Sequence, residues 1–282
     1  MSKTQRENPM KDVKLTQKLT ETGLMLALAV ILSVVKIAEL PYGGSITLAS
    51  MLPLIVISYR YGVGWGSLTG LVFGLIQMII GMNNVSYATS VIAAVAIILL
   101  DYLFAFTAVC LGGLFRRMAN QSAAFFLSAL AVCFVRYAFH VISGCTVWAG
   151  LSIPTTDAFF SSLLYNGTSM LPETIITVVA AIYLGTVLDF SSPRLRQNNL
   201  ERIPLAAHVL NVISGLLFVA AIAAVVAMIF PKMQNAETGT FDITGITAVN
   251  TTALIIVAAV ALIVICALQM VKLYIIRNAK QS

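Results

Sequence analysis

Four ionisable residues lie inside otherwise apolar segments of membrane length: Asp101, Arg136, His140 and Glu173. A charged group at the centre of a membrane helix costs about 2.5–3.5 kcal/mol even on the mildest scales. Such groups are therefore expected to face the interior of a helix bundle, where they pair with one another or contact a ligand. This constraint predicts a membrane-embedded bundle with polar groups in its interior.

The composition is that of a membrane protein. Of the 282 residues, 59% are hydrophobic and 10% are charged, whereas about 25% of the residues in a soluble domain are charged. Because a helix needs about 20 apolar residues to cross the bilayer core, we expect an all-α integral membrane protein. Eight segments are long enough, or nearly so: Leu19–Ala38, Leu48–Tyr59, Val63–Met82, Ala88–Phe115, Ala123–Trp148, Phe159–Leu188, Ala207–Phe230 and Thr252–Leu273. The second is short and contains Pro53, which predicts a tilted, broken or partly re-entrant helix.

The basic residues are distributed unevenly along the chain. The loops predicted on one side of the membrane hold Lys3, Arg6, Lys11, Lys14, Lys18, Arg60, Arg116, Arg117, Arg194, Arg196, Arg202, Lys272, Arg277 and Lys280. The opposite loops hold only Lys232. This positive-inside pattern predicts a multi-pass protein of the cell membrane with both termini in the cytoplasm. The net charge of +6 therefore indicates topology rather than nucleic-acid binding.

Polar segments divide the chain into four parts. Residues 1–18 form a basic cytoplasmic lead, and residues 19–189 form a predicted six-span core. Residues 190–206 form a basic cytoplasmic linker, and residues 207–282 form an accessory transmembrane hairpin and tail. The sequence shows no strict internal repeat, so an inverted-repeat transporter gains no direct support.

The fourth and fifth segments hold most candidate binding residues. Asp101 precedes Tyr102 in the fourth segment. An aspartate inside a membrane segment is explained in one of three ways: it forms a structural ion pair, it relays protons, or it contacts a ligand. Arg136 and His140 are four residues apart and share a helix face, which Tyr137 flanks. These alternatives remain open for each residue taken alone.

Trp148 and Asn166 extend the candidate site. Trp148 lies two turns beyond His140, either as an interfacial anchor or as a pocket wall that stacks on a cationic or aromatic ring. Asn166 offers hydrogen-bond donors and an acceptor. Glu173 and Arg136 are expected to form a structural ion pair. Together these groups predict a site for a small, flat, cationic molecule that forms hydrogen bonds.

Small residues mark two further features. Gly44 lies in the loop between the first two spans, where adjacent glycines let the backbone approach a ligand. Gly23 and Ala27 are four residues apart, a spacing that lets another helix approach closely. Both patterns also occur in ordinary turns and membrane helices.

Several catalytic motifs are absent. The sequence has no Walker A loop, so the chain is not expected to hydrolyse ATP alone, and it has no HExxH or GxSxG motif. Its cysteines lack metal-ligand spacing and are expected to be small core residues: Cys110, Cys133, Cys145 and Cys266. These observations predict no enzyme activity, no metal and no cofactor.

Five stretches occur in the order found in one known family: LTETGLMLALA, LPYGGSITLASMLPLIVISYRYG, LLDYLFAFTAVCLGGLFRR, VRYAFHVISGCTVWAG and SSLLYNGTSMLPE. The block from about residue 19 to 189 resembles the thiamine-binding substrate (S) components of energy-coupling factor (ECF) transporters, the ThiT/YuaJ family. The resemblance implies a six-helix bundle with a thiamine pocket near the outer face. It implies that the loop between the first two helices is a lid over that pocket.

The resemblance assigns expected roles by matching position. The acidic residue and tyrosine of the family fall on Asp101 and Tyr102, its histidine on His140, its aromatic residue on Trp148 and its asparagine on Asn166. The acidic group is then expected to face the charged or amino groups of thiamine, and Trp148 to pack on the rings. The small-residue pair falls on the surface that contacts the coupling protein EcfT, which binds two ATPases.

This chain departs from the family pattern at four positions. Asp101 stands where family members often have Glu, and Ser161 stands at an expected aromatic position that Tyr165 or Phe160 could replace. Gly44 and Leu48 stand where the family lid has tryptophan and glutamate. These differences bear on the affinity and on the exact ligand, including phosphorylated or precursor forms of thiamine.

The expected function is high-affinity thiamine uptake as the S component of an ATP-driven transporter in the lipid bilayer. The residues also allow a stand-alone secondary transporter that couples protons through Asp101, Arg136 and Glu173. A membrane enzyme that acts on a lipid would use His140 with a carboxylate as its acid–base pair. A structural scaffold would explain the hairpin but not the buried polar cluster.

Overall fold

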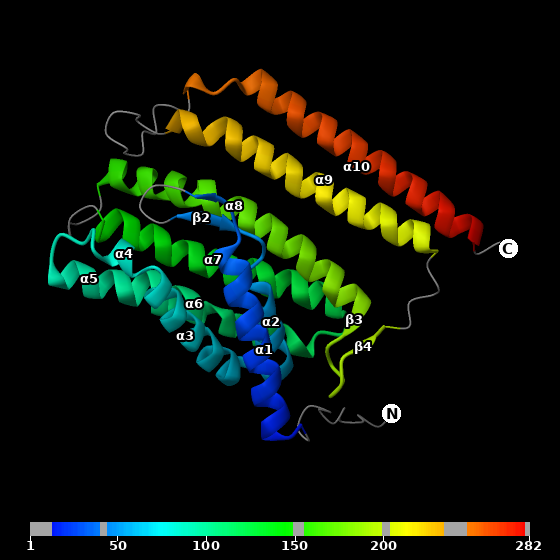
Figure 1. Ribbon diagram of the computed structural model, residues 1–282, viewed down its shortest axis with the longest axis horizontal. Coiled ribbons are helices and arrows are strands. Elements are labelled where there is room, and N and C mark those ends of the chain that lie inside the picture. The colour runs from blue at the N-terminus through cyan, green and yellow to red at the C-terminus, as the bar shows by residue number, and fades with distance from the viewer. Residues whose placement is uncertain (1–12, 40–43, 149–154, 199–203, 234–246, 280–282) are drawn as a thin grey trace, which may run out of the picture. The chain divides into compact units, whose positions relative to one another are not determined.

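The computed structural model describes residues 13–39, 44–148, 155–198, 204–233 and 247–279. The chain forms two compact units, Met1–Asn198 and Asn199–Ser282, whose elements are shown in Figure 1. Among the described residues, six helices are long and apolar enough to cross a membrane. The chain is therefore an all-α integral membrane protein, as the composition predicts.

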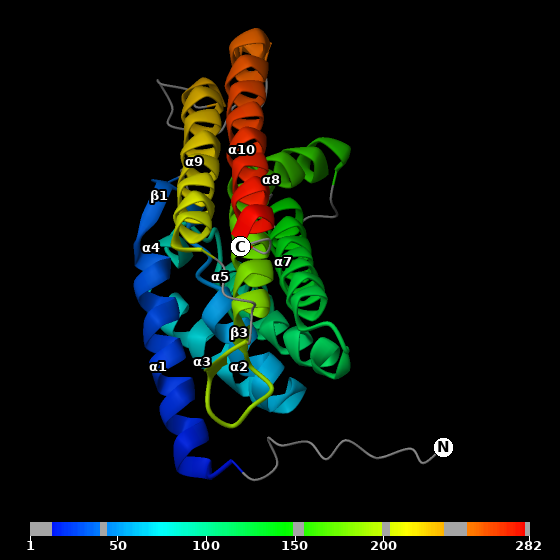
Figure 2. The same cartoon turned by 90° about the vertical axis from the view of Figure 1, so that its right-hand side faces the viewer.

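The first unit is a helix bundle with two small antiparallel strand pairs. Its elements are α1 (Leu15–Val34), β1 (Lys36–Glu39), β2 (Ser45–Thr47), α2 (Leu52–Tyr61), α3 (Val63–Ile80), α4 (Met82–Val85), α5 (Val91–Ile97), η3 (Ile98–Phe104), α6 (Ala105–Thr107), η4 (Ala108–Arg117), α7 (Gln121–Thr146), α8 (Thr156–Val187), β3 (Leu188–Asp189) and β4 (Arg196–Gln197). The long helices α7 and α8 run side by side (Figure 1). Figure 2 shows α1 and α7 on opposite sides of this unit.

The second predicted membrane segment is a ten-residue helix at the centre of the bundle. In α2, every residue from Leu52 to Arg60 is buried. It packs against α1, α3, α7 and η4, so its apolar residues face protein rather than lipid. A helix surrounded in this way does not need the length that a bilayer demands of a lipid-exposed helix.

The first predicted segment ends earlier than expected. Helix α1 stops at Val34, and the following residues form β1, which pairs with β2. The prediction of a helix up to Ala38 was wrong because an apolar run does not distinguish the end of a helix from a short strand. Residues 40–43 of the predicted lid lie outside the described residues.

The fourth predicted segment is one continuous helical stretch with three different pitches. From Val91 to Arg117 the backbone passes from α-helix through the π-helical η3 and a short α6 to the 3₁₀ helix η4. Glycines on α3 let this stretch approach closely: a Cβ at Gly70 would lie 2.5 Å from the carbonyl oxygen of Phe106. A Cβ at Gly74 would lie 2.7 Å from the carbonyl oxygen of Tyr102. Small residues thus allow backbone contact between these helices.

Arg60 connects three segments at one end of the first unit. Its side chain is 1% exposed, and its Nε donates to Glu21 Oε2 at 3.0 Å. Its two terminal nitrogens donate to the carbonyl oxygens of Phe190, Ser192 and Pro193 at 3.0, 3.1 and 3.2 Å. The sequence places Arg60 in a solvated loop, whereas the structure shows a buried guanidinium that joins α1, α2 and the segment after α8.

Residues 190–198, which the sequence assigns to a linker, pack within the first unit. Phe190 is 2% exposed and packs against Phe125, with the ring centroids 4.9 Å apart and the rings tilted by 37°. The carboxylate of Asp189 accepts the amide hydrogen of Ser191 at 2.9 Å and a hydroxyl hydrogen of Ser192. Partial burial alone would raise the pKa of Asp189, but these hydrogen bonds lower it. The turn therefore keeps a charged carboxylate at neutral pH.

The second unit consists of two long helices that pack against each other, α9 (Leu205–Ile229) and α10 (Thr251–Ala279), with η5 (Phe230–Met233) after α9. Gln269 Nε2 donates to Ser214 Oγ at 2.9 Å, a polar link between the two helices. Cys133 and Cys145 of the first unit are buried, Cys110 is half-buried and Cys266 is exposed. The prediction of a core cysteine was therefore wrong for Cys266.

Arg60→Met is expected to lower the free energy of unfolding by about 3 kcal/mol, the low end for breaking a buried ion pair, since Glu21 is 24% exposed. Thermal unfolding of the purified protein in detergent measures the change. Arg117→Met, at an exposed arginine, is the control. Equal melting temperatures for the two variants would show that the Arg60 contacts contribute nothing net.

Candidate binding site

Asp101 lies in the π-helical turn η3, with its side chain 14% exposed. One oxygen, Oδ1, lies 2.9 Å from His140 Nδ1. The other, Oδ2, accepts hydrogen bonds from Ser143 Oγ at 2.7 Å and Trp148 Nε1 at 3.2 Å. Short π-helical turns inside helices often occur at functional sites. Here the turn presents one carboxylate to three donors on or just after α7.

The pairing with Asp101 orients the imidazole of His140. An ionised carboxylate only accepts hydrogen bonds, so Nδ1 is the nitrogen that carries the shared hydrogen. The other ring nitrogen, Nε2, then acts as an acceptor toward another group while the imidazole is neutral, or as a donor once it is protonated. His140 and Ser143 are three residues apart on α7, a spacing that brings both to the same side of the helix.

Asn166 joins α8 to α7 beside this cluster. Its Nδ2 donates to the carbonyl oxygen of His140 at 3.3 Å and to that of Ser162 at 3.0 Å. Ser162 Oγ donates in turn to the carbonyl oxygen of Val141 at 2.8 Å. Since the nitrogen of the amide is used within the bundle, the carbonyl oxygen Oδ1 remains as an acceptor.

Gly144 allows the two helices to meet here. A Cβ at Gly144 would lie 2.2 Å from Ser162 Oγ, which is far inside van der Waals contact. Tyr137 strengthens the same contact, because its hydroxyl donates to the carbonyl oxygen of Leu163 at 2.7 Å. Tyr137 thus connects α7 to α8.

Two other predicted residues lie apart from the Asp101 cluster. Tyr102 is 8% exposed, and its hydroxyl donates to the carbonyl oxygen of Gly81 at 3.0 Å, at the end of α3. Gly44, just before β2, donates its amide hydrogen to the hydroxyl oxygen of Tyr165 at 3.2 Å. Tyr165 lies on α8, so this bond attaches the start of β2 to α8.

Arg136 and Glu173 form a separate buried pair. Arg136 Nη1 lies 3.2 Å from Glu173 Oε2, and Glu173 is 2% exposed. The other oxygen, Oε1, accepts from Thr47 Oγ1 at 2.6 Å and from Ser50 Oγ at 3.0 Å. Between these two residues Ala49 adopts a positive φ of 54°, a strained conformation for a residue with a side chain. Glu173 thus holds the turn that follows β2.

The remaining predicted residues lie on the surface. Gly23 and Ala27 are exposed on α1, and a Cβ at Gly23 would meet no atom within 4 Å. Among the described residues, no group of three or more His, Cys, Asp or Glu side chains could hold a metal ion.

Ser143, Ser162 and Gly144 were not identified from the sequence. Serine and glycine are common small residues in membrane helices, and nothing in their spacing marks these three. The only signal is their position: Ser143 and Gly144 follow His140 within the same helical turn.

Together, these observations define an all-α membrane protein whose bundle encloses a polar cluster of carboxylate, imidazole, indole and amide groups. The sequence model described as "Thiamine transporter protein (Thia_YuaJ)" matches residues 19–191. The chain belongs to this thiamine transporter family. Helices α9 and α10 lie outside the matched range.

Two relatives support this assignment. "Thiamine transporter ThiT" of Bacillus subtilis (strain 168) is 32% identical over 202 residues, which cover 67% of this chain and 99% of the relative. "Thiamine transporter ThiT" of Lacticaseibacillus paracasei is 28% identical over 184 residues, which cover 59% of this chain and 86% of the relative. The family assignment indicates a transporter rather than an enzyme.

Gly144→Ala is expected to destabilise the protein by about 1–3 kcal/mol, because the new methyl group overpacks the contact with Ser162. Thermal unfolding measures the loss. The control is Gly167→Ala, where the nearest atom to an added Cβ is 3.6 Å away. Ser162→Ala removes the clashing oxygen, so the double variant should lose less than the sum of the single losses. Additive losses would show that the two residues do not compete for this space.

Proposed function

We propose that this protein binds thiamine and serves as the substrate-specificity component of an ATP-driven ECF transporter. The observation that carries the proposal is the single carboxylate of Asp101, enclosed by His140, Ser143 and Trp148. Both relatives named above are called thiamine transporters. The family match covers residues 19–191, which include all of these residues.

The charge of the cluster favours a cation. Among the described residues, the only ionisable partner of Asp101 is His140, whose imidazole can be neutral, unlike an arginine or lysine side chain. With a neutral imidazole, the cluster carries one negative charge in a largely buried site. The thiazolium ring of thiamine is positively charged, and a cation close to a carboxylate is strongly favoured where water is scarce.

The neighbouring groups favour a flat heterocycle with amino substituents. Trp148 supplies an aromatic face for stacking or cation–π contact. The carbonyl oxygen of Asn166 and the free nitrogen of His140 supply polar contacts for an aminopyrimidine edge. Asp101, His140, Trp148 and Asn166 are the proposed contact residues, with Tyr102, Tyr137 and Gly44 positioning the helices and the β2 segment around them.

The position of the cluster favours entry from outside. Asp101 lies 15 residues before Arg116 in one helical stretch, which corresponds to roughly 20–25 Å along its axis. Arg116 belongs to the basic end of the bundle, which includes Arg60 and the 194–196 segment. By the positive-inside rule this end faces the cytoplasm, as do both termini in the proposed topology.

The exposed Gly23 and Ala27 support docking to a partner. Their open surface on α1 lets a helix of the coupling protein approach closely. This protein would then supply binding and specificity, while two ATPases bound to the coupling protein supply the energy. The proposed cycle is capture of thiamine outside, docking, and rotation of the loaded bundle in the membrane to release thiamine inside.

Thiamine should quench the tryptophan fluorescence of the purified protein saturably. The chain has two tryptophans, Trp65 and Trp148, and Trp65 lies elsewhere, with its Nε1 bonded to Thr22 Oγ1. Quenching is therefore expected to disappear in Trp148→Phe and to persist in Trp65→Phe. Absence of quenching at millimolar thiamine, in protein shown to be folded, would exclude thiamine as the ligand.

Asp101→Asn is expected to weaken thiamine binding by about 30-fold or more, since it removes the charge that faces the cation. Calorimetric titration measures the affinity. Asp189→Asn, at a carboxylate outside the cluster, is the matched control and should bind as tightly as the unmodified protein. Equal affinity for both variants would refute the role of Asp101.

Gly23→Leu tests the coupling mechanism. The larger side chain should leave thiamine binding intact but reduce uptake several-fold in proteoliposomes that contain the coupling protein, the ATPases and ATP. Gly64→Leu, at another exposed glycine with open space, is the control. Uptake that needs no ATPase and follows a proton gradient would instead support a secondary transporter.

A further inference from the structure

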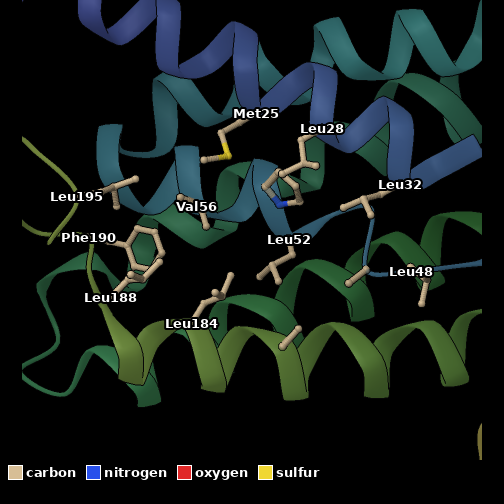
Figure 3. A pocket seen from close by; sticks show the side chains of 13 residues that line it. Met25, Leu28, Leu32, Leu48, Leu52, Val56, Leu184, Leu188, Phe190 and Leu195 are labelled. Atoms are coloured by element: carbon tan, nitrogen blue, oxygen red, sulfur yellow. The ribbon is translucent and has the colours of Figure 1, made fainter. Parts of the chain in front are cut away.

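A cavity of about 320 Å³ lies between α1, α2, α8 and the strands after α8, apart from the Asp101 cluster (Figure 3). Its walls include Met25, Leu28 and Leu32 of α1, Val56 of α2, Leu184 of α8 and Phe190. All 13 lining side chains are apolar. An apolar cavity of about 150 Å³ stays dry and can hold benzene. This larger cavity is therefore suited to hydrocarbon rather than water.

The cavity is elongated and reaches the surface. Figure 3 shows Leu188, Phe190 and Leu195 at one end and Leu32 and Leu48 at the other. Two of its lining residues, Leu28 and Leu195, are 42% and 44% exposed. Because α1 is an apolar helix of membrane length, the open side faces a region rich in lipid chains. An extended alkyl chain fits this shape.

Two arginines are the sequence neighbours of a residue that lines one end of the cavity. Leu195, a lining residue, stands between Arg194 and Arg196, both of which are exposed. Neither arginine forms an ion pair with a residue that the structure describes. Asp189 lies opposite Arg196 in the β3–β4 pair, but its carboxylate already accepts hydrogen bonds from Ser191 and Ser192. Basic residues at the end of a membrane bundle attract anionic lipid head groups.

We propose that this cavity binds one anionic phospholipid, with an acyl chain between α1 and α8 and its phosphate beside Arg194 and Arg196. The apolar walls and the adjacent positive charges match the two parts of such a molecule. The site is independent of thiamine binding.

Native mass spectrometry of the full chain tests the proposal. The protein is mixed with equal amounts of phosphatidylglycerol and phosphatidylcholine that carry identical palmitoyl and oleoyl chains. One bound phosphatidylglycerol is expected, preferred over phosphatidylcholine by roughly 30-fold if each arginine contributes as basic residues do near anionic lipids. The double variant Arg194→Gln and Arg196→Gln should lose this preference, whereas Arg117→Gln should keep it. Equal retention of both lipids by the unmodified protein would overturn the head-group assignment.

Two pairs of variants locate the acyl chain. Ala180→Phe places a ring in the cavity and should abolish lipid retention, whereas Val179→Phe, at the next residue and outside the lining, should not. Leu28→Gln changes only the exposed rim and should weaken retention without disturbing the fold. Leu24→Gln, also exposed on α1 but outside the lining, is its control. Retention in both Ala180→Phe and Leu28→Gln equal to that of their controls would overturn the proposal.

Discussion

The stability of the first unit depends on the pairing of charged side chains that are buried in the bundle, away from water. Burial of an unpaired charge costs several kcal/mol, and the bundle contains three pairs from distant segments. In the Arg60–Glu21 pair the arginine also donates to backbone carbonyls, and in the Arg136–Glu173 pair the glutamate also accepts from two hydroxyls. Asp101 differs, because its partners are an imidazole, a hydroxyl and an indole. Of these three carboxylates, only Asp101 has no arginine partner among the described residues, and its proposed role in binding rests on this difference.

The sequence predicted the class of fold and the main polar residues because hydrocarbon makes such residues conspicuous. Asp101, His140 and Glu173 stand out in apolar runs, and their positions alone indicate an interior location. Helical spacing was less informative about partners. Arg136 and His140 share a face by the i, i+4 rule, yet they belong to different clusters, since Arg136 contacts Glu173 and His140 contacts Asp101. Spacing within one helix cannot show which neighbouring helix lies opposite each residue.

Other features left no local signal in the sequence. The π-helical turn at Asp101 is a small change of pitch in an apolar run, and no residue type marks it. Arg60 follows an apolar segment and precedes a glycine-rich turn, so it has the pattern of a solvated loop; its burial depends on carbonyl groups 130 to 133 residues away. Gly144 and Ser162 carry no local signal for a similar reason, because their contact exists only once α7 and α8 are packed.

The Asp101 cluster and the cavity beside α1 have opposite chemistry, and the two proposals assign a different molecule to each. The Asp101 cluster offers charge and hydrogen bonds, whose burial is tolerable only when they are satisfied by one another or by a ligand. The cavity beside α1 offers only apolar walls, which exclude polar molecules and gain from contact with hydrocarbon. Its charged end, Arg194 to Arg196, lies just beyond the range that matches the family model and just before the second unit begins. The proposed lipid would therefore hold in place the segment through which the family core continues into its additional pair of helices.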